Sequence, residues 1–293
     1  MRAALLTSAA LAASAFAIPL AAQETADEKV MALGDEYYDY GLAAYGMTET
    51  ESGQTELGDS YWSVTPQSQQ ERAGRYAEIL ERLDAIDRNA LSPEARTNAL
   101  VLRTLLENDI GDARFSEWEM PFDSDSNFWS YLTPRGGLTT VDEYEDYIGR
   151  MRDLPRLFDE HIANATAGLE RGFSVPRITL EGRDVSIEAF VTAKPEDSPF
   201  WTPFAQIPDR FSDQDKTRLE AAGREAISER VTPAYRELLT FFRDTYLPQT
   251  RTTLGASEFP DGKAYYAQQI RQYTTLDLTA EQIHQIGLEE VAR

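Results

Sequence analysis

Cysteine is absent from the 293-residue sequence, and histidine occurs only twice, as His161 and His284. The lack of cysteine excludes disulfide bonds, thiol catalysis, a lipid-modified cysteine anchor and cysteine-ligated zinc in this chain. The two histidines lie far apart, so there is no His-Glu-x-x-His motif, which places two zinc ligands on one helical face. We therefore expect this chain to bind no metal, and each histidine to have a surface or packing role.

The fingerprints of several enzyme classes are also missing. No Gly-x-Ser-x-Gly, P-loop or dinucleotide-binding motif is present, so serine hydrolases, NTPases and Rossmann enzymes have no support. Residues 123–127 begin like a calcium-binding loop, but Phe128 replaces its glycine and Pro134 its glutamate. Asx turns explain that run better. Carboxylates are so abundant that spacing identifies no acid–base pair for a glycosidase.

Basic residues are scarce: 28 lysines and arginines face 50 acidic residues, for a net charge of −22. Such a field repels the phosphates of nucleic acids and anionic membranes. We therefore expect no nucleic-acid partner, and an acidic surface that keeps the protein soluble.

Long hydrophobic runs are missing after residue 22. Residues 1–22 have one basic residue, Arg2, an Ala/Leu-rich run, and small residues at cleavage sites after Ala17 or Ala22. This pattern predicts a secretory signal peptide, and the run is short of the ~20 apolar residues of a membrane span. We expect a periplasmic or secreted protein with no membrane contact after cleavage, consisting of one helical domain over residues 23–293.

Most longer segments show helical spacing, and no convincing strand ladder is present, so the predicted fold is all-α with long loops. Residues 48–66 are predicted to be a loop, and 119–139 an aromatic-rich connector that packs down. The helices are predicted at 26–45, 69–87, from the Ser92 cap onward, 140–152, 155–172, 185–192, and 212–246 with a kink or split at Pro233. In the helix after Ser92, the predicted buried residues are Leu100, Val101, Leu105 and Leu106.

The last helix begins clearly but has no stop signal. Thr279 and Gln282 form a capping box, and an apolar stripe then runs through Ile283 and Leu288 to Val291. We therefore expect Arg293 to be a truncation point rather than a natural terminus.

The segment before it carries the candidate contacts. An Asp-Gly turn at 261–262 precedes a helix in which two adjacent tyrosines point about 100° apart, so that one can pack while the other offers its hydroxyl to a cleft. A turn with ordinary helix capping is the alternative interpretation. The residues concerned are Tyr265, Tyr266, Arg271, Thr274 and Thr275.

The order of several motifs resembles the exported bacterial family catalogued as domain of unknown function 885. The resemblance covers most of the mature chain and is most specific over residues 231–293. The motifs are Val231-Thr-Pro233-Ala234-Tyr235, Tyr246-Leu-Pro248, Pro260-x-Gly262-x-x-Tyr265-Tyr266, Tyr273-Thr274-Thr275, Leu278-Thr279-x-Glu281-x-Ile283-His284 and Gly287-Leu288-x-Glu290-Val291.

Members of that family look like helical zinc metallopeptidases, distantly similar to the thimet oligopeptidase and carboxypeptidase Taq groups. The resemblance implies the N-terminal half of a gluzincin-type helical bowl with a deep channel. It also implies that zinc and its His-Glu motif belong to a C-terminal half missing from this chain, which would be inactive alone. By motif position, the five residues above would be substrate contacts in the channel wall.

The leading hypothesis is therefore the N-terminal part of an exported zinc peptidase acting on peptides. A second hypothesis is a non-catalytic helical periplasmic protein that binds peptides or small ligands. A third, weaker one is a purely structural envelope protein.

Overall fold

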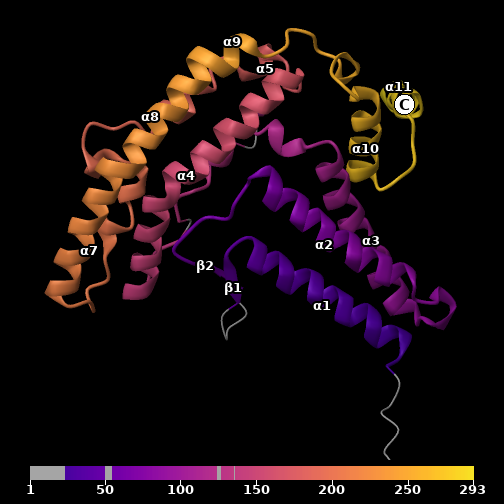
Figure 1. The fold of residues 1–293 in the computed structure, drawn as a ribbon, viewed down its shortest axis with the longest axis horizontal. Coiled ribbons are helices and arrows are strands. Elements are labelled where there is room, and N and C mark those ends of the chain that lie inside the picture. The colour runs from indigo at the N-terminus through magenta and orange to yellow at the C-terminus, as the bar shows by residue number, and fades with distance from the viewer. Residues whose placement is uncertain (1–23, 50–54, 124–126, 135) are drawn as a thin grey trace, which may run out of the picture.

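The computed structural model describes residues 24–49, 55–123, 127–134 and 136–293, and the predicted signal peptide lies outside these ranges. The described chain is mainly α-helical and forms an arch with two arms (Figure 1). One arm holds α1 (Ala26–Ala44), α2 (Pro66–Asp84) and α3 (Pro93–Arg114). The other arm and the top hold α4 (Val141–Arg171), α5 (Arg177–Leu180), α6 (Asp184–Glu188), α7 (Asp213–Ala226), α8 (Thr232–Thr240) and α9 (Leu247–Gln249).

The first arm begins each helix with a local signal. Thr25 forms a capping box with Glu28, and Thr65 and Ser92 cap α2 and α3, each followed by proline at the first helical position. These caps satisfy backbone N–H groups that have no partner within the helix. The three helices bury a core of Val30, Leu33, Tyr76, Ile79, Leu83, Leu91, Ala95, Leu102 and Leu106.

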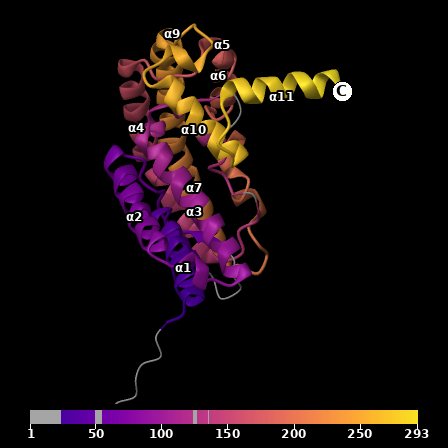
Figure 2. The ribbon, with the colours of Figure 1, turned by 90° about the vertical axis from the view of Figure 1, so that its right-hand side faces the viewer.

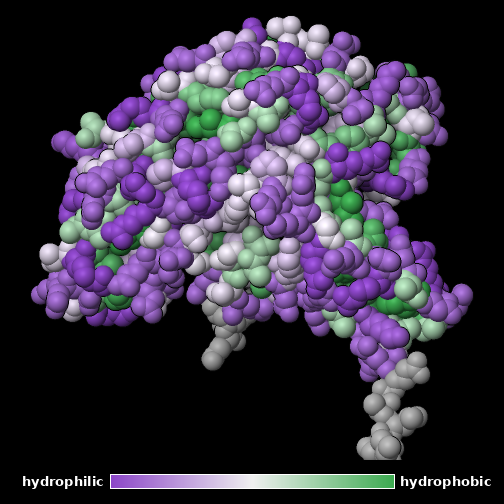
Figure 3. Space-filling model, viewed as in Figure 1, coloured by the Kyte–Doolittle hydropathy of each residue, from purple (hydrophilic) through white to green (hydrophobic). Residues whose placement is uncertain are grey.

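The predicted buried face of α3 was largely wrong. Leu106 is buried, but Leu100, Val101 and Leu105 are exposed, and Leu102 takes their place in the core. Apolar side chains occur on several sides of this helix, so its sequence does not decide which side meets α1 and α2. Figure 3 shows hydrophobic residues among the hydrophilic ones on this arm.

A short hairpin replaces part of the predicted loop at 48–66. Strand β1 (Met47–Glu49) pairs antiparallel with β2 (Thr55–Leu57), and Met47 lies opposite Leu57. The Arg150 guanidinium on α4 donates from Nη1 to the Leu57 carbonyl at 2.8 Å. The hairpin escaped prediction because each strand has only three residues, with a single apolar one, which is too short to show an alternating hydrophobic pattern.

Helix α4 is continuous, whereas two helices meeting at Pro155 were predicted. It runs from a Thr140 capping box to Gly172, which ends it with φ of 73°. Residues on both sides of the proline are buried, among them Met151, Leu154, Leu157 and Phe158. Packing of this continuous apolar face outweighs the missing N–H of proline.

The predicted helix 212–246 is one nearly continuous path from α7 to α9. Two π-helical stretches, Ile227–Val231 and Phe241–Tyr246, interrupt its α geometry. Pro233 and Pro248 follow these stretches within two residues. The wider π-helical turns accommodate the hydrogen bonds that proline cannot donate, so the helical path continues instead of splitting.

The second arm contains the larger core. The aromatic connector packs down as predicted, with Phe122 and Trp129 fully buried. The Trp129 indole donates to Ser186 Oγ at 3.1 Å. The backbone carbonyl of Trp129 accepts from the Tyr235 hydroxyl at 2.6 Å. This connector therefore joins α4, α6 and α8.

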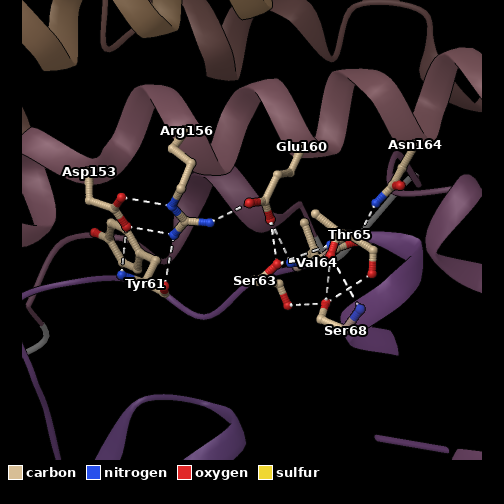
Figure 4. A network of polar contacts seen from close by, with 9 residues as sticks. All are labelled: Tyr61, Ser63, Val64, Thr65, Ser68, Asp153, Arg156, Glu160 and Asn164. Atoms are coloured by element: carbon tan, nitrogen blue, oxygen red, sulfur yellow. Dashed lines mark hydrogen bonds and ion pairs between the residues drawn. The ribbon is translucent and has the colours of Figure 1, made fainter. Parts of the chain in front are cut away.

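A polar network fastens the segment before α2 to α4 (Figure 4). The Arg156 guanidinium bonds Asp153 Oδ1 at 2.8 Å, Glu160 Oε1 at 2.7 Å and the Tyr61 carbonyl at 2.8 Å. The Val64 N–H donates to Glu160 Oε2 at 2.7 Å. The residues that these bonds join to α4 lie 92 or more positions earlier in the sequence, so the network connects the two arms.

The last two helices are α10 (Gly262–Thr274) and α11 (Ala280–Ala292). Helix α10 lies beside the end of α3, while α11 projects away from the rest of the molecule (Figure 2). The predicted Thr279 capping box is present, and no residue of α11 is buried. Among the described helices, none is long and apolar enough to cross a membrane.

Candidate functional site

A polar cavity of about 280 Å³ lies between α2, the end of α3 and the 3₁₀ turn Glu117–Glu119. Its wall combines one arginine with three acids and several aromatic side chains. The lining residues are Tyr45, Gln69, Arg72, Ala73, Tyr76, Asp109, Asp112, Ala113, Glu117 and Trp118.

Arg72 is the buried cation of this cavity, with only 7% of its surface exposed. It occupies the same face of α2 as Tyr76, Ile79 and Leu83, where the spacing calls for an apolar residue. Its Nη2 donates to Gln69 Oε1 at 3.0 Å, and its guanidinium stacks 4.8 Å from the Tyr45 ring centroid. Its Nη1 atom has no hydrogen-bond partner among the described residues.

Acids from two elements face this cation. Asp109 and Asp112 lie one turn apart on α3, and Glu117 lies on the following 3₁₀ turn. The Tyr37 hydroxyl donates to Asp109 Oδ2 at 3.1 Å. Burial raises the pKa of Asp112 to about 8, and its hydrogen bond to the Glu117 carboxyl group acts in the same direction.

We predict that Asp112→Asn stabilises the protein at pH 8.5 and has little effect at pH 4. The ordinary aspartate pKa is about 3.9, so a raised folded pKa makes the free energy of unfolding fall as pH rises from about 4 to about 8. Asparagine carries no charge, and we expect it to recover about 1–2 kcal/mol at pH 8.5, since solvent screens part of the effect. Urea denaturation at both pH values tests this, with Asp35→Asn on the exposed side of α1 as control. An equal effect of Asp112→Asn at both pH values would contradict it.

The turn that carries Glu117 and Trp118 is held by the end of α4. Arg171 Nε bonds Glu119 Oε2 at 2.6 Å, and its Nη2 donates to the Phe115 carbonyl at 3.0 Å. Gly168 lies directly against this turn, and a Cβ there would stand 2.1 Å from the Glu119 carbonyl oxygen. The second arm thus positions one wall of a cavity that belongs to the first.

Two side chains of α10 hydrogen-bond to the cavity acids Glu117 and Asp112 from outside the cavity. Tyr265 is 9% exposed, and its hydroxyl donates to Glu117 Oε1 at 2.8 Å. Its ring packs against Phe115, Phe173 and Phe259. Gln272 hydrogen-bonds to Asp112 and counteracts the rise in its pKa. Tyr265 is therefore a positioning residue for the cavity and does not line it.

The other predicted contact residues lie elsewhere. Tyr266 is 48% exposed, and Arg271 pairs with Asp277 at 2.8 Å beside a separate surface pocket. Thr274 Oγ1 donates to the Ile270 carbonyl at 2.6 Å, and Thr275 ends α10 with φ of 59°. The structure thus brings only Tyr265 to the cavity, through Glu117.

The sequence interpretation did not identify any of the charged cavity residues. A signal was available for Arg72, because it lies one turn before Tyr76 on the same face as the apolar stripe of α2. Asp109, Asp112 and Glu117 carry no such signal in a chain with 50 acidic residues.

Neither histidine has a metal-site environment. His161 stacks on Phe128 with ring centroids 3.8 Å apart, and burial lowers its pKa to about 3. His284 lies exposed on α11. Across the described ranges, no group of three or more histidine or acidic residues could hold a metal ion, so these residues do not fit a zinc site. The calcium-loop-like run falls partly on residues 124–126, outside the described residues.

Comparisons with known proteins identify the family and the fold. No curated protein matches the chain. A crystal structure described as "the putative lipoprotein from Colwellia psychrerythraea" is similar, with a TM-score of 0.75 and 20% sequence identity. The match covers 92% of this chain but 50% of that one, so this chain spans half the length of that relative. The profile of DUF885, described as a bacterial protein of unknown function, matches residues 47–293, and the chain therefore belongs to the DUF885 family.

Proposed function

We propose that this chain is the N-terminal part of an exported, zinc-dependent, peptidase-like hydrolase, in which it supplies substrate contacts and no catalytic residue. The observation behind this role is the cavity at Arg72, whose lining residues include buried polar atoms with no partner among the described residues. Burying a polar atom without a partner costs free energy, and binding sites commonly keep such atoms because a ligand can pair with them. The peptidase activity itself is an extension from the family resemblance.

Zinc would be held outside this chain. The described residues contain no cluster of three or more potential ligands, and the metal and the general base would therefore belong to a C-terminal half of the protein. This chain covers 50% of the related chain, which is consistent with a second half of similar length. Residues 23–293 alone would then be inactive.

Helix α11 is the surface on which that half would dock. On its predicted apolar stripe, Leu288 is 52% and Val291 89% exposed, and Ile286 is 48% exposed on another side of the helix. The helix projects from the body (Figure 2), and none of its residues is buried. An exposed apolar stripe of this kind is typical of a surface that meets another segment.

A non-catalytic periplasmic binding protein is the second candidate function. The Arg72 cavity favours it, because binding of a small ligand there requires neither zinc nor a second half. Export is proposed for both candidates on the basis of residues 1–22.

The peptidase proposal is tested on the product of the full reading frame, with residues 23–293 produced in parallel. We expect about one zinc per full-length molecule by elemental analysis, and cleavage of a peptide library that stops on chelation and returns with added zinc. The shorter form should show neither. Zinc-free, inactive full-length protein would contradict the peptidase proposal and leave the binding protein as the better account.

A further inference from the structure

Three residues that line the α2–α3 cavity each carry a buried polar atom that lacks a hydrogen-bond partner among the described residues. The atoms are Arg72 Nη1, Trp118 Nε1 and Asp112 Oδ1, and they come from α2, the 3₁₀ turn and α3. Arg72 is the most informative of them, because it is more than nine-tenths buried and still keeps a free donor. Buried polar groups in proteins usually have partners, so three on one cavity point to a ligand or to water.

The two nitrogen atoms define one half of that ligand. Arg72 Nη1 and Trp118 Nε1 can only donate, so both need an acceptor. A carboxylate suits these two donors because one of its oxygens can accept from the guanidinium and the other from the indole N–H, and charge-assisted hydrogen bonds are stronger than neutral ones.

The acids define the other half. Even with Asp112 protonated, Asp109 and Glu117 outnumber Arg72, which is the one lysine or arginine among the described lining residues, so acidic groups exceed basic ones in the cavity. A carboxylate alone would meet this field unfavourably, and a cation alone would leave the Arg72 and Trp118 donors without acceptors. One molecule with both groups satisfies both sides.

We infer that this cavity binds a small zwitterion with an ammonium and a carboxylate group, the chemistry of a free α-amino acid. The carboxylate would accept from Arg72 and Trp118, and the ammonium group would donate to Asp112 and the acids around it. A volume of about 280 Å³ is at the lower end of ligand pockets, which span roughly 300–1,000 Å³, and suits a molecule of this size.

This inference extends the proposed substrate contacts to a ligand class, but its test is separate from that of the peptidase. Binding is measured on chelator-treated full-length protein, in which zinc chemistry is absent. Loss of peptidase activity with retained binding would count only against the proposed function. Peptidase activity without binding would count only against this inference.

The experiment is a thermal-shift screen of the twenty common L-amino acids, followed by calorimetry with the strongest one. At 100 times its Kd, a true ligand should raise the Tm by about 3 °C or more. Two derivatives of the same amino acid then separate its charges: the methyl ester keeps only the ammonium group, and the N-acetyl form keeps only the carboxylate. We expect each to bind about tenfold or more weakly.

Variants locate the site. Arg72→Met should weaken binding by about tenfold or more, while Arg82→Met, exposed on the same helix and paired with Glu36, should bind like the natural protein. Because Arg72→Met removes a buried charge and can impair folding, Trp118→Phe and Asp112→Asn provide a second test. Each of these should weaken binding several-fold with an unchanged circular dichroism spectrum.

Several results would overturn the inference. No Tm shift with any amino acid would mean that water alone fills the cavity. Full affinity for the methyl ester would make it a cation site, and full affinity for the N-acetyl form an anion site. Unchanged binding in folded Arg72→Met, Trp118→Phe and Asp112→Asn would place the ligand elsewhere.

Discussion

Replacing Phe122 by alanine is expected to lower the free energy of unfolding by about 3–5 kcal/mol. The side chain is fully buried, and alanine would leave a cavity at the centre of the larger core. Its ring lies 4.4 Å from the ring centroid of Tyr246, the shortest of five aromatic contacts. The others are with Phe128, Trp129, Phe241 and Phe242.

Urea denaturation followed by far-UV circular dichroism measures this effect. Tyr273→Ala is the control, because that ring is 82% exposed and its loss should change the free energy of unfolding by less than about 0.5 kcal/mol. Similar denaturation midpoints for Phe122→Ala and Tyr273→Ala would show that Phe122 in the connector does not stabilise the core.

Replacing Arg156 by methionine is expected to cost about 2–3 kcal/mol. The guanidinium neutralises Asp153 and Glu160 and also donates to the Tyr61 carbonyl at 2.8 Å. Without it, two carboxylates on the same side of α4, which are 19% and 15% exposed, lose the cation that pairs with both. Removing one partner from a buried pair costs about 3–5 kcal/mol, and the partial exposure here reduces that figure.

The same helix offers a matched control. Arg152→Met removes a guanidinium that is 52% exposed and pairs only loosely with Glu225, at 3.7 Å, so we expect a change within about 0.5 kcal/mol. Proteolysis gives a second measurement, since Arg156→Met should expose the 61–68 segment to cleavage earlier than Arg152→Met does. Equal stability and equal cleavage in the two variants would mean that the network in Figure 4 does not fasten the two arms.

Helix starts could be predicted because their signals are local. Ser92 before Pro93 and the Thr279 capping box appear in the structure at the predicted positions. A cap needs only the few residues that follow it, so a short stretch of sequence contains the whole interaction.

Helix continuity and helix faces could not be predicted in the same way. Pro155 predicted a break, but Leu154 and Leu157 are buried in the larger core with residues of other elements, and this packing keeps α4 continuous. On α3, the choice between Leu102 and Leu105 as the buried residue depends on where α1 and α2 lie. Both outcomes rest on free energy gained from packing between segments, which no local pattern contains.

The residues at the candidate cavity also divide into those that the sequence indicates and those that only the folded structure identifies. Tyr265 stood out in the sequence through its motif, and the structure places it in a hydrogen bond with Glu117, 148 residues away. Arg72 and Asp112 had no motif, and they became candidates only when folding brought their unpartnered atoms to one wall.

By itself, the sequence determined the mainly helical class, the helix caps at Ser92, Thr140, Ser212 and Thr279, and the absence of a histidine motif or cysteine ligand in this chain. These properties follow from composition and from interactions over a few residues. Only the tertiary structure decided that α4 is one helix, that α11 stands apart, and that Arg72 faces acids from another helix. Those outcomes depend on burial and charge across long sequence separations, and burial becomes defined only when the segments have packed together.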